Sequence, residues 1–218
     1  MTHVKKRVVV LVSGRGSNMM SLVETARAPD YPAEIVAVIS NRPEAPGLAW
    51  AAAQGIPTVA IDHKAYDTRF AFEARLHTAI LDARADLVCM AGFMRMLTGG
   101  FIDRWRDRLI NIHPSLLPAF PGLQTHARAI EEGVKIAGCT VHLVRLEMDT
   151  GPIIAQAAVP VFTGDTPEML GRRVLAAEHR LYPHALALFA SGKARVFGET
   201  IQILQSVNQD KALFSPSF

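Results

Sequence analysis

The feature that most constrains the fold is an apolar run that ends in glycines and leads directly into a helical pattern. Residues 8–12 read Val-Val-Val-Leu-Val, residues 13–18 read Ser-Gly-Arg-Gly-Ser-Asn, and the helical pattern starts near Met19. Such a run is typical of a strand buried on both faces, as in a parallel sheet covered by helices. The glycines then let the chain turn into the helix. This segment predicts a strand, loop and helix unit of an α/β protein.

The same alternation continues along the chain. Strands are expected at residues 34–40, 58–61, 86–91 and 109–113, and helices at residues 47–54, 66–84 and 98–105. Strands that alternate with helices in this way are typical of βαβ units, whose strands run parallel. We therefore expect a Rossmann-like α/β fold, with a mainly parallel twisted sheet and helices on both of its faces.

The later part of the chain has a different pattern. A short helix at residues 127–132 precedes two expected strands at residues 136–146 and 153–160, whose connection is too short for a helical crossover. This favours a mixed or antiparallel extension of the sheet. Thr166 and Pro167 predict the start of a long helix, and Pro183 is expected to end or kink that helix.

The length and composition predict a single domain over residues 1–218. Half of the residues are apolar, which is enough for a full core. We expect an N-terminal half over about residues 6–107 and a C-terminal half over about residues 108–192. A tail follows at residues 193–218, beginning with strand-like pieces at 195–197 and 200–204.

Charge and cysteine usage exclude several kinds of partner. The net charge is +3, but the lysines and arginines are scattered, so nucleic acid is not expected as a partner. No apolar run approaches the roughly 20 residues of a membrane span. Cys89 and Cys139 both lie in or beside apolar segments, which predicts reduced thiols in a cytoplasmic protein and no cysteine metal site. We expect no metal.

The glycine loop, residues 14–18, predicts an anion site. Free N–H groups and the positive end of the helix dipole favour a phosphate there. The loop lacks the third glycine of a dinucleotide fingerprint, since Met19 stands in that place, and Asn41 and its neighbours replace the acidic residue expected after the second strand. A monophosphate is the preferred interpretation, and a purely structural turn is the alternative.

A second polar site is expected where the fifth strand ends. Asn111 and His113 point to the same face of that strand, and Pro114 and Pro118 prevent its continuation. Ligands of open α/β sheets bind at the carboxyl ends of the strands. The alternative is that Asn111 caps a turn and His113 is an ordinary buried histidine.

Other side chains allow two interpretations from the residues alone. Arg69 lies in the first turn of an expected helix. Its charge is either solvated at the surface or paired with the carboxylate of a bound ligand. The methionines of residues 92–97 are expected in the core, or in the wall of a pocket for a flat aromatic ligand. Glu178 is expected off the buried stripe of its helix and solvated, or facing a ligand. His142 is expected to be structural.

Five segments together resemble the phosphoribosylglycinamide formyltransferases, a family within the folate formyltransferase superfamily. The segments are Gly16-Ser17-Asn18, Ala91-Gly92-Phe93-Met94-Arg95, Asn111-Ile112-His113-Pro114-Ser115-Leu116-Leu117-Pro118, Thr140-Val141-His142 and Asp149-x-Gly151-Pro152. The resemblance runs from about residue 8 to residue 192. The Ser-Leu-Leu-Pro segment marks only the superfamily. The Gly-Ser-Asn segment and the lack of an added domain narrow the resemblance to this one family.

The resemblance implies transfer of a formyl group from the co-substrate 10-formyltetrahydrofolate to the amine of glycinamide ribonucleotide in purine biosynthesis. The residues that it implies for glycinamide ribonucleotide are Gly16, Ser17 and Asn18 on the phosphate and Glu178 on the ribosyl part. Those that it implies for the folate are Arg69 on the acidic tail and Met94, Arg95, Met96, Leu97, Asn111 and Val144 around the pterin.

The implied chemistry needs a donor for the oxyanion of a tetrahedral intermediate and a proton for the folate nitrogen that leaves. Asn111 fits the first need and His113 the second. Asp149 would orient His113, directly or through a water, and favour the imidazolium. One departure from the family pattern is Gln124, at a position where a histidine is frequent.

The nearest alternative is 10-formyltetrahydrofolate hydrolase, in which water replaces the amine. That enzyme carries an added N-terminal regulatory domain, whereas the first strand here starts by Arg7. Methionyl-tRNA formyltransferase has a further C-terminal domain, and a NAD-binding Rossmann protein has the complete glycine fingerprint. An exposed sheet edge would be compatible with a homodimer.

Overall fold

The computed structural model describes residues 4–204 and residue 215. The chain divides into two compact units. The first unit comprises Met1–Asn111 and Leu143–Leu146, and the second comprises Ile112–His142 and Glu147–Phe218.

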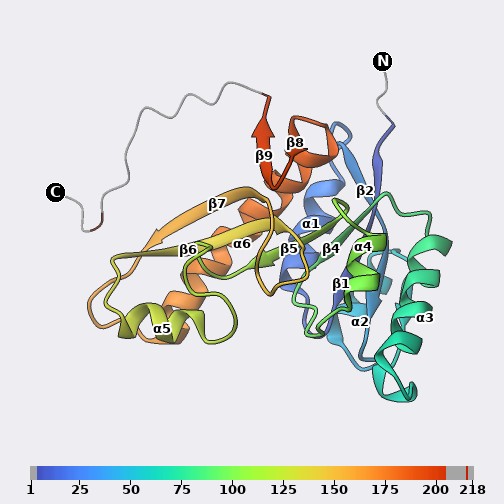
Figure 1. Ribbon diagram of the computed structural model, residues 1–218, viewed down its shortest axis with the longest axis horizontal. Coiled ribbons are helices and arrows are strands. Elements are labelled where there is room, and N and C mark those ends of the chain that lie inside the picture. Colours follow the sequence, from blue (N-terminus) through green and yellow to red (C-terminus); the bar gives the residue numbers. More distant parts are fainter. Residues whose placement is uncertain (1–3, 205–214, 216–218) are drawn as a thin grey trace. The chain divides into compact units, whose positions relative to one another are not determined.

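The first unit alternates strands and helices (Figure 1). Its strands are β1 (Lys6–Val12), β2 (Ala33–Ser40), β3 (Thr58–Ala60), β4 (Leu87–Met90) and the start of β5 (Leu109–His113), and its helices are α1 (Ser17–Ala26), α2 (Pro46–Ala53), the 3-10 helix η1 (His63–Ala65), α3 (Arg69–Asp82) and α4 (Gly99–Arg104). β1 pairs in parallel with β2 and β4, β2 with β3, and β4 with β5. The expected βαβ alternation is confirmed.

Both faces of β1 are buried. Val9 and Leu11 join an apolar cluster with Phe72 and Leu76 of α3 and with residues of α4. The alternate residues Val8, Val10 and Val12 point to the other face and are also fully buried. The prediction of a strand covered on both sides is therefore confirmed.

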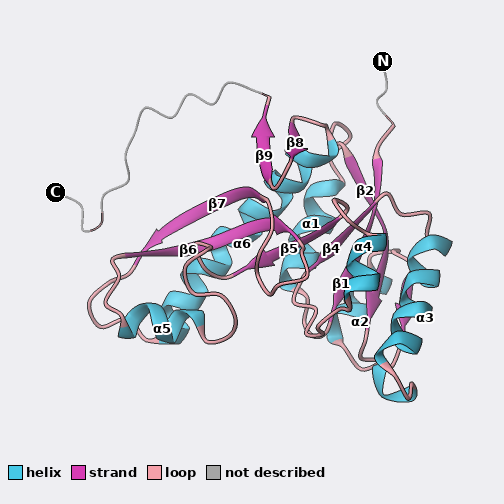
Figure 2. Cartoon of the chain, viewed as in Figure 1, coloured by secondary structure: helices cyan, strands magenta, loops and turns pink. Residues whose placement is uncertain are grey.

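The second unit contains an antiparallel pair of strands and a long helix (Figure 2). Its elements are α5 (Thr125–Glu131), β6 (Ile136–Leu143), β7 (Ile153–Pro160), α6 (Pro167–Ala190), β8 (Ala194–Phe197) and β9 (Thr200–Ile203). β6 and β7 are antiparallel, as the short connection predicted. The order of strands in the seven-stranded sheet is β3-β2-β1-β4-β5-β6-β7, so the sheet is mostly parallel with an antiparallel extension.

Helix α6 has the expected start, and it excludes one of the two alternatives for Pro183, the end of the helix. The Thr166 side chain caps it by accepting a hydrogen bond from the Met169 N–H, as expected. Pro183, however, does not end the helix, which continues to Ala190. Tyr182 and Pro183 are both buried, and packing of this face stabilises a helix that proline alone would interrupt, at a cost of about 3 kcal/mol.

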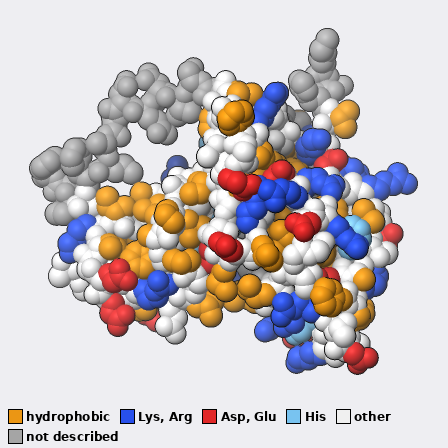
Figure 3. Space-filling model, viewed as in Figure 1, with side chains coloured by type: hydrophobic (Ala, Val, Ile, Leu, Met, Phe, Trp, Pro, Cys, Tyr) orange, Lys and Arg blue, Asp and Glu red, His pale blue; other side chains and the backbone are white. Residues whose placement is uncertain are grey.

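The surface carries charges of both signs. On the face shown in Figure 3, Lys and Arg side chains lie among Asp and Glu side chains. No helix in the described part of the chain is long and apolar enough to cross a membrane. Residues 205–214 and 216–218 of the expected tail lie outside the described residues, and its two strand-like pieces are β8 and β9.

Candidate active site

The glycine loop is held by its own backbone and by helix α2. Gly16 has φ 71° and caps α1, so Ser17 and Asn18 are the first two helical residues, earlier than the sequence predicted. The first helical hydrogen bond runs from the Met20 N–H to the Gly16 carbonyl, so the amides of Ser17 and Asn18 lie outside the helical ladder. A Cβ on Gly47 of α2 would lie 2.9 Å from the Gly14 carbonyl oxygen. The loop is thus packed closely against α2.

The methionine loop, residues 94–97, follows β4. Met94 and Met96 are 61% and 51% exposed, so the expectation that they belong to the core is wrong. Leu97 alone anchors the loop in the apolar cluster of the first unit. The described residues offer no hydrogen-bond partner to the buried Nε of Arg95. Exposed thioethers beside a buried, unsatisfied donor are typical of a surface that a ligand completes.

Two further residues implied for the folate, Arg69 and Val144, belong to the first unit. Arg69 is exposed at the first residue of α3. Val144 is half-buried, and its N–H donates to the Leu109 carbonyl oxygen at 2.9 Å. The predicted strand from residue 136 to residue 146 therefore ends earlier, because β6 stops at Leu143 and Val144 pairs with β5.

Strand β5 carries the predicted catalytic pair. It spans Leu109–His113, as expected, and Asn111 and His113 are two residues apart on it. The His113 Nδ1 lies 3.3 Å from Oδ1 of Asp149, with side chains 8% and 12% exposed. The contact is direct, whereas the sequence left open an intervening water.

Nearby backbone groups make polar contacts with both His113 and Asp149. The His113 Nε2 lies 3.0 Å from the Phe120 carbonyl oxygen, and Oδ2 of Asp149 accepts a hydrogen bond of 2.7 Å from the Gly122 N–H. Both ring nitrogens therefore face oxygen acceptors. These contacts fix the orientation of the imidazole ring from both sides.

The turn after His113 is fixed by residues that the sequence reasoning had not assigned to the site. The Thr140 hydroxyl donates to the Ser115 carbonyl at 2.7 Å and accepts from the Leu117 N–H at 3.0 Å. The Gln156 amide donates to the Leu117 carbonyl at 2.9 Å. In the sequence, the one signal that marked Thr140 was its place in Thr140-Val141-His142, a segment that carries the family resemblance.

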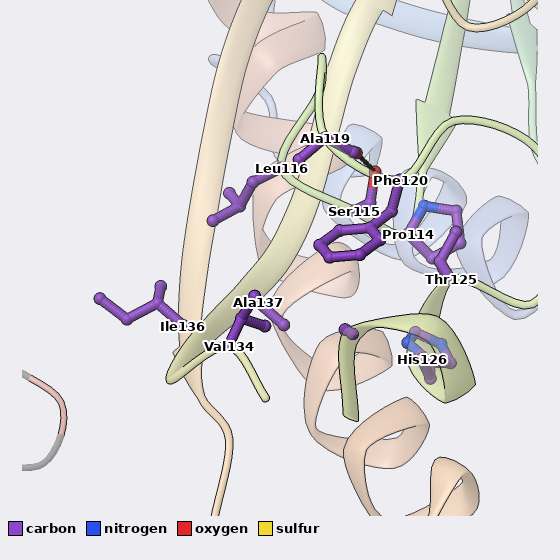
Figure 4. A pocket seen from close by; sticks show the side chains of 11 residues that line it. Pro114, Ser115, Leu116, Ala119, Phe120, Thr125, His126, Val134, Ile136 and Ala137 are labelled. Carbon is purple, nitrogen blue, oxygen red and sulfur yellow. Dashed lines mark hydrogen bonds between the residues drawn. The ribbon is translucent and has the colours of Figure 1, made fainter. Parts of the chain in front are cut away.

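A cavity of about 140 Å³ lies beneath this turn and is lined mainly by apolar side chains (Figure 4). Phe120 and His126 face it from the loop and from α5. The Ser115 hydroxyl at its edge donates to the Ala119 carbonyl at 2.6 Å. Burial lowers the pKa of His126, and the nearby charge of His113 lowers it further. Both effects disfavour the charged form of His126 beside the cavity.

Glu178 corrects another prediction. It is 6% exposed on α6, not solvated. Leu170, Val174, Glu178 and Leu181 recur every three or four residues on the buried face of the helix, so Glu178 lies on the buried stripe and not off it. Burial, and then the negative charge of Glu178, raise the pKa of Cys139 to about 12. His142 is also buried, and its Nδ1 lies 3.1 Å from the Thr150 carbonyl oxygen.

The predicted residues thus form local groups within each unit. In the second unit, His113 and Asp149 are in direct contact. In the first unit, the Met94 N–H donates to the hydroxyl of Ser13, the residue before the glycine loop, at 2.7 Å. Among the described residues, no cluster of three or more His, Cys, Asp or Glu side chains has the arrangement of a metal site.

Comparison with known proteins gives consistent matches. Residues 6–186 match the formyl transferase family. Phosphoribosylglycinamide formyltransferase of Escherichia coli is 41% identical over 189 residues, which cover 87% of this chain and 89% of that protein. The crystal structure of phosphoribosylglycinamide formyltransferase from Brucella melitensis is 54% identical, with a TM-score of 0.84, covering 87% of this chain and 97% of that chain.

A longer relative matches over the same region. The trifunctional purine biosynthetic protein adenosine-3 of Bos taurus is 48% identical over 192 residues, which cover 88% of this chain. The match covers 19% of that relative's own length. Because the family match extends over most of the sequence, the chain belongs to the formyl transferase family.

Proposed function

We propose that this chain transfers the formyl group of 10-formyltetrahydrofolate to the amine of glycinamide ribonucleotide, a step of purine biosynthesis. The observation that carries the proposal is the direct contact between His113 and Asp149 at the end of β5, two residues after Asn111. This arrangement supplies an N–H donor, a proton carrier and a fixed negative charge at one strand end.

Glycinamide ribonucleotide would bind through its phosphate at the glycine loop. The amides of Ser17 and Asn18 lie at the positive end of α1, outside its hydrogen-bond ladder. Gly16 allows the backbone to approach the phosphate closely, because no side chain covers it. Glu178 is proposed to accept a hydrogen bond from a ribosyl hydroxyl.

The folate would bind through its pterin at the methionine loop. Met94 and Met96 offer exposed, adaptable apolar surface, and Leu97 holds the loop to the core. The buried Nε of Arg95 is a donor that a ligand oxygen or nitrogen would satisfy. Val144 and Asn111 are proposed as further folate contacts, and Arg69 is proposed to pair with the acidic tail. No metal is part of the proposal.

In the reaction, the amine attacks the formyl carbon and the carbonyl electrons move to oxygen. Asn111 donates a hydrogen bond to this oxyanion, and one such donor lowers the barrier by roughly 2.7 to 4 kcal/mol in other enzymes. Collapse of the intermediate breaks the bond between the formyl carbon and the folate nitrogen. That nitrogen gains a proton while the attacking amine loses one, and His113 is placed to move it.

The Phe120 carbonyl and the substrate compete for one proton of His113. In this structure the His113 Nε2 is within hydrogen-bond distance of that carbonyl, and Asp149 holds Nδ1. For Nε2 to donate to the substrate, the carbonyl must give way. Asp149 keeps the ring oriented throughout that exchange.

The test compares His113→Ala with His184→Ala, a change of an exposed histidine on α6. Formation of tetrahydrofolate is followed by absorbance with and without glycinamide ribonucleotide. We expect His113→Ala to lower the rate by about 10² to 10⁴ while His184→Ala keeps it. A wild-type rate in His113→Ala removes that residue from the mechanism. Release of tetrahydrofolate at the full rate without the amine identifies the alternative hydrolase.

The proposed activity places the protein in the cytoplasm. Both cysteine side chains are buried, which is compatible with thiols in a reducing compartment. The homodimer stays a prediction, and sedimentation equilibrium of the full chain measures it.

A further inference from the structure

A buried serine connects the two loops that the proposed function assigns to different substrates. Ser13 follows the last residue of β1, is 4% exposed and precedes the glycine loop. Its Oγ accepts a hydrogen bond of 2.7 Å from the Met94 N–H, at the start of the methionine loop. Its own proton is then available to Asn41, whose Oδ1 lies 2.5 Å away. The donor and the acceptor of both hydrogen bonds of the Ser13 hydroxyl are therefore defined.

Asn41 extends the network to two more strand ends. It follows β2 and is 2% exposed. The His63 Nδ1, after β3, lies 2.9 Å from the Asn41 carbonyl oxygen and 3.2 Å from its Nδ2. A protonated Nδ1 donates to the carbonyl and an unprotonated one accepts from the amide, so either tautomer holds Asn41 in place. Residues after β1, β2, β3 and β4 thus share one polar network within the first unit.

The two loops are joined by a side-chain hydrogen bond as well as by a backbone hydrogen bond. The Ser13 N–H also donates to the Gly92 carbonyl at 3.2 Å. Ser13 therefore forms hydrogen bonds with the residues on both sides of Phe93. If the methionine loop moved away, the buried Ser13 Oγ would lose the hydrogen bond that it accepts from the Met94 N–H, which is costly. A shift of either loop is therefore transmitted to the other.

We propose that Ser13 and Asn41 are positioning residues that couple the two substrate sites, so that a phosphate on the glycine loop strengthens folate binding at the methionine loop. The coupling is reciprocal, because a folate that orders the methionine loop also strengthens phosphate binding. This inference rests on the proposed function for the identity of the substrates. The hydrogen-bond network itself does not depend on it.

The first experiment measures hydrogen exchange at the Met94 amide in the full chain, with and without inorganic phosphate. Ser13→Ala removes the acceptor of that amide, and we expect roughly five- to tenfold faster exchange, the size expected for one lost hydrogen bond. Phosphate should slow the exchange in the wild type and not in Ser13→Ala. The matched control is Ser40→Ala, since Ser40 is a fully buried serine at the end of β2 whose hydroxyl accepts a hydrogen bond from the Arg42 N–H and not from the methionine loop.

The second experiment measures the Kd of tetrahydrofolate, which carries no formyl group to transfer, with and without glycinamide ribonucleotide. We expect the ribonucleotide to tighten binding at least about fivefold in the wild type and in Ser40→Ala, and by less than twofold in Ser13→Ala and Asn41→Ala. An unchanged ratio in Ser13→Ala, or an equal loss in Ser40→Ala, overturns the coupling. If wild-type protein transfers no formyl group but phosphate still protects Met94, the proposed function fails and the coupling of the loops stands.

Discussion

Asp149 combines three unusual properties in one residue. Its φ is 53°, its Oδ1 faces His113, and its Oδ2 accepts from the Gly122 N–H. Aspartate and asparagine tolerate this left-handed backbone better than other side chains, whereas alanine does not. The position therefore needs a residue that accepts the backbone conformation and also carries the charge.

Two substitutions at Asp149 separate these needs. Asp149→Asn keeps the backbone preference and removes the charge, so we expect formyl transfer to fall by about 10² to 10⁴ with little change in Tm. Asp149→Ala should lose activity and also lower the free energy of unfolding by about 1 kcal/mol. Kinetics and urea unfolding of both variants measure this. Equal stability losses in the two variants would show that the charge, and not the backbone, stabilises the loop.

At the scale of elements, helix α2 supports the glycine loop through a residue without a side chain. The Gly47 N–H donates to the Gly14 carbonyl oxygen at 3.1 Å. A Cβ at this position would lie 2.9 Å from Gly14 O and 3.2 Å from Arg15 O. Both contacts are to backbone atoms, so the loop itself must shift to accommodate a methyl group.

Gly47→Ala should therefore weaken substrate binding more than folding. Alanine favours a helix by up to about 1 kcal/mol over glycine, which offsets part of the clash in stability. We expect the KM for glycinamide ribonucleotide to rise about tenfold. The control is Gly100→Ala in α4, where a Cβ would meet nothing within 4 Å. An unchanged KM in Gly47→Ala would mean that the loop tolerates the displacement.

The connection between β7 and α6 is held by an ion pair. Asp165 accepts two hydrogen bonds of 2.9 Å from Arg173 and one of 2.8 Å from the Phe162 N–H. The hydrogen bond from Arg173, followed by that from Phe162, lowers the pKa of Asp165 to about 2. Because this pKa lies below its ordinary value of 3.8, the ionised group stabilises the folded chain above about pH 4. The contribution is lost as the pH falls to about 2.

Asp165→Asn should lower the free energy of unfolding at pH 7, and the difference from wild type should shrink as the pH falls from about 4 to about 2. Urea unfolding across this pH range measures the difference. Asp30→Asn, at an exposed aspartate, provides the control and should show no such trend. A difference between Asp165→Asn and wild type that stays constant down to pH 2 would contradict the assigned cause.

At the scale of the whole molecule, each of the two cysteines can serve as a probe for the unfolding of one unit. Cys89 in β4 belongs to the first unit and Cys139 in β6 to the second, and both are fully buried. Burial and the charge of Glu178 raise the pKa of the Cys139 thiol to about 12, far from its ordinary value of 9.0. Neither thiol should react with an alkylating reagent until its unit unfolds.

Labelling at increasing urea therefore tests the predicted single domain. We expect both cysteines to become reactive at the same urea concentration, as in a cooperative two-state transition. Peptide mapping by mass spectrometry assigns the label to each thiol, and circular dichroism gives the global transition as control. Labelling of Cys139 well before Cys89 would mean that the units unfold independently.

The elements were largely predictable because their signals are local. The apolar run of β1, the cap of α6 at Thr166 and the short connection between β6 and β7 each depend on neighbouring residues. The polar strand end at Asn111 and His113 was visible for the same reason. Assignment of these segments to a family added the substrates, which no periodicity in the chain states.

The sequence by itself determined the order of strands and helices along the chain and the residue types at the strand ends. It could do so because hydrophobic periodicity and capping act over a few residues. Only the tertiary structure decided that Glu178 is buried, that α6 continues through Pro183 and that Met94 and Met96 are exposed. It also brought Asp149 against His113 and Ser13 against Met94. These outcomes depend on packing between segments distant in the sequence, and that packing outweighs local preference.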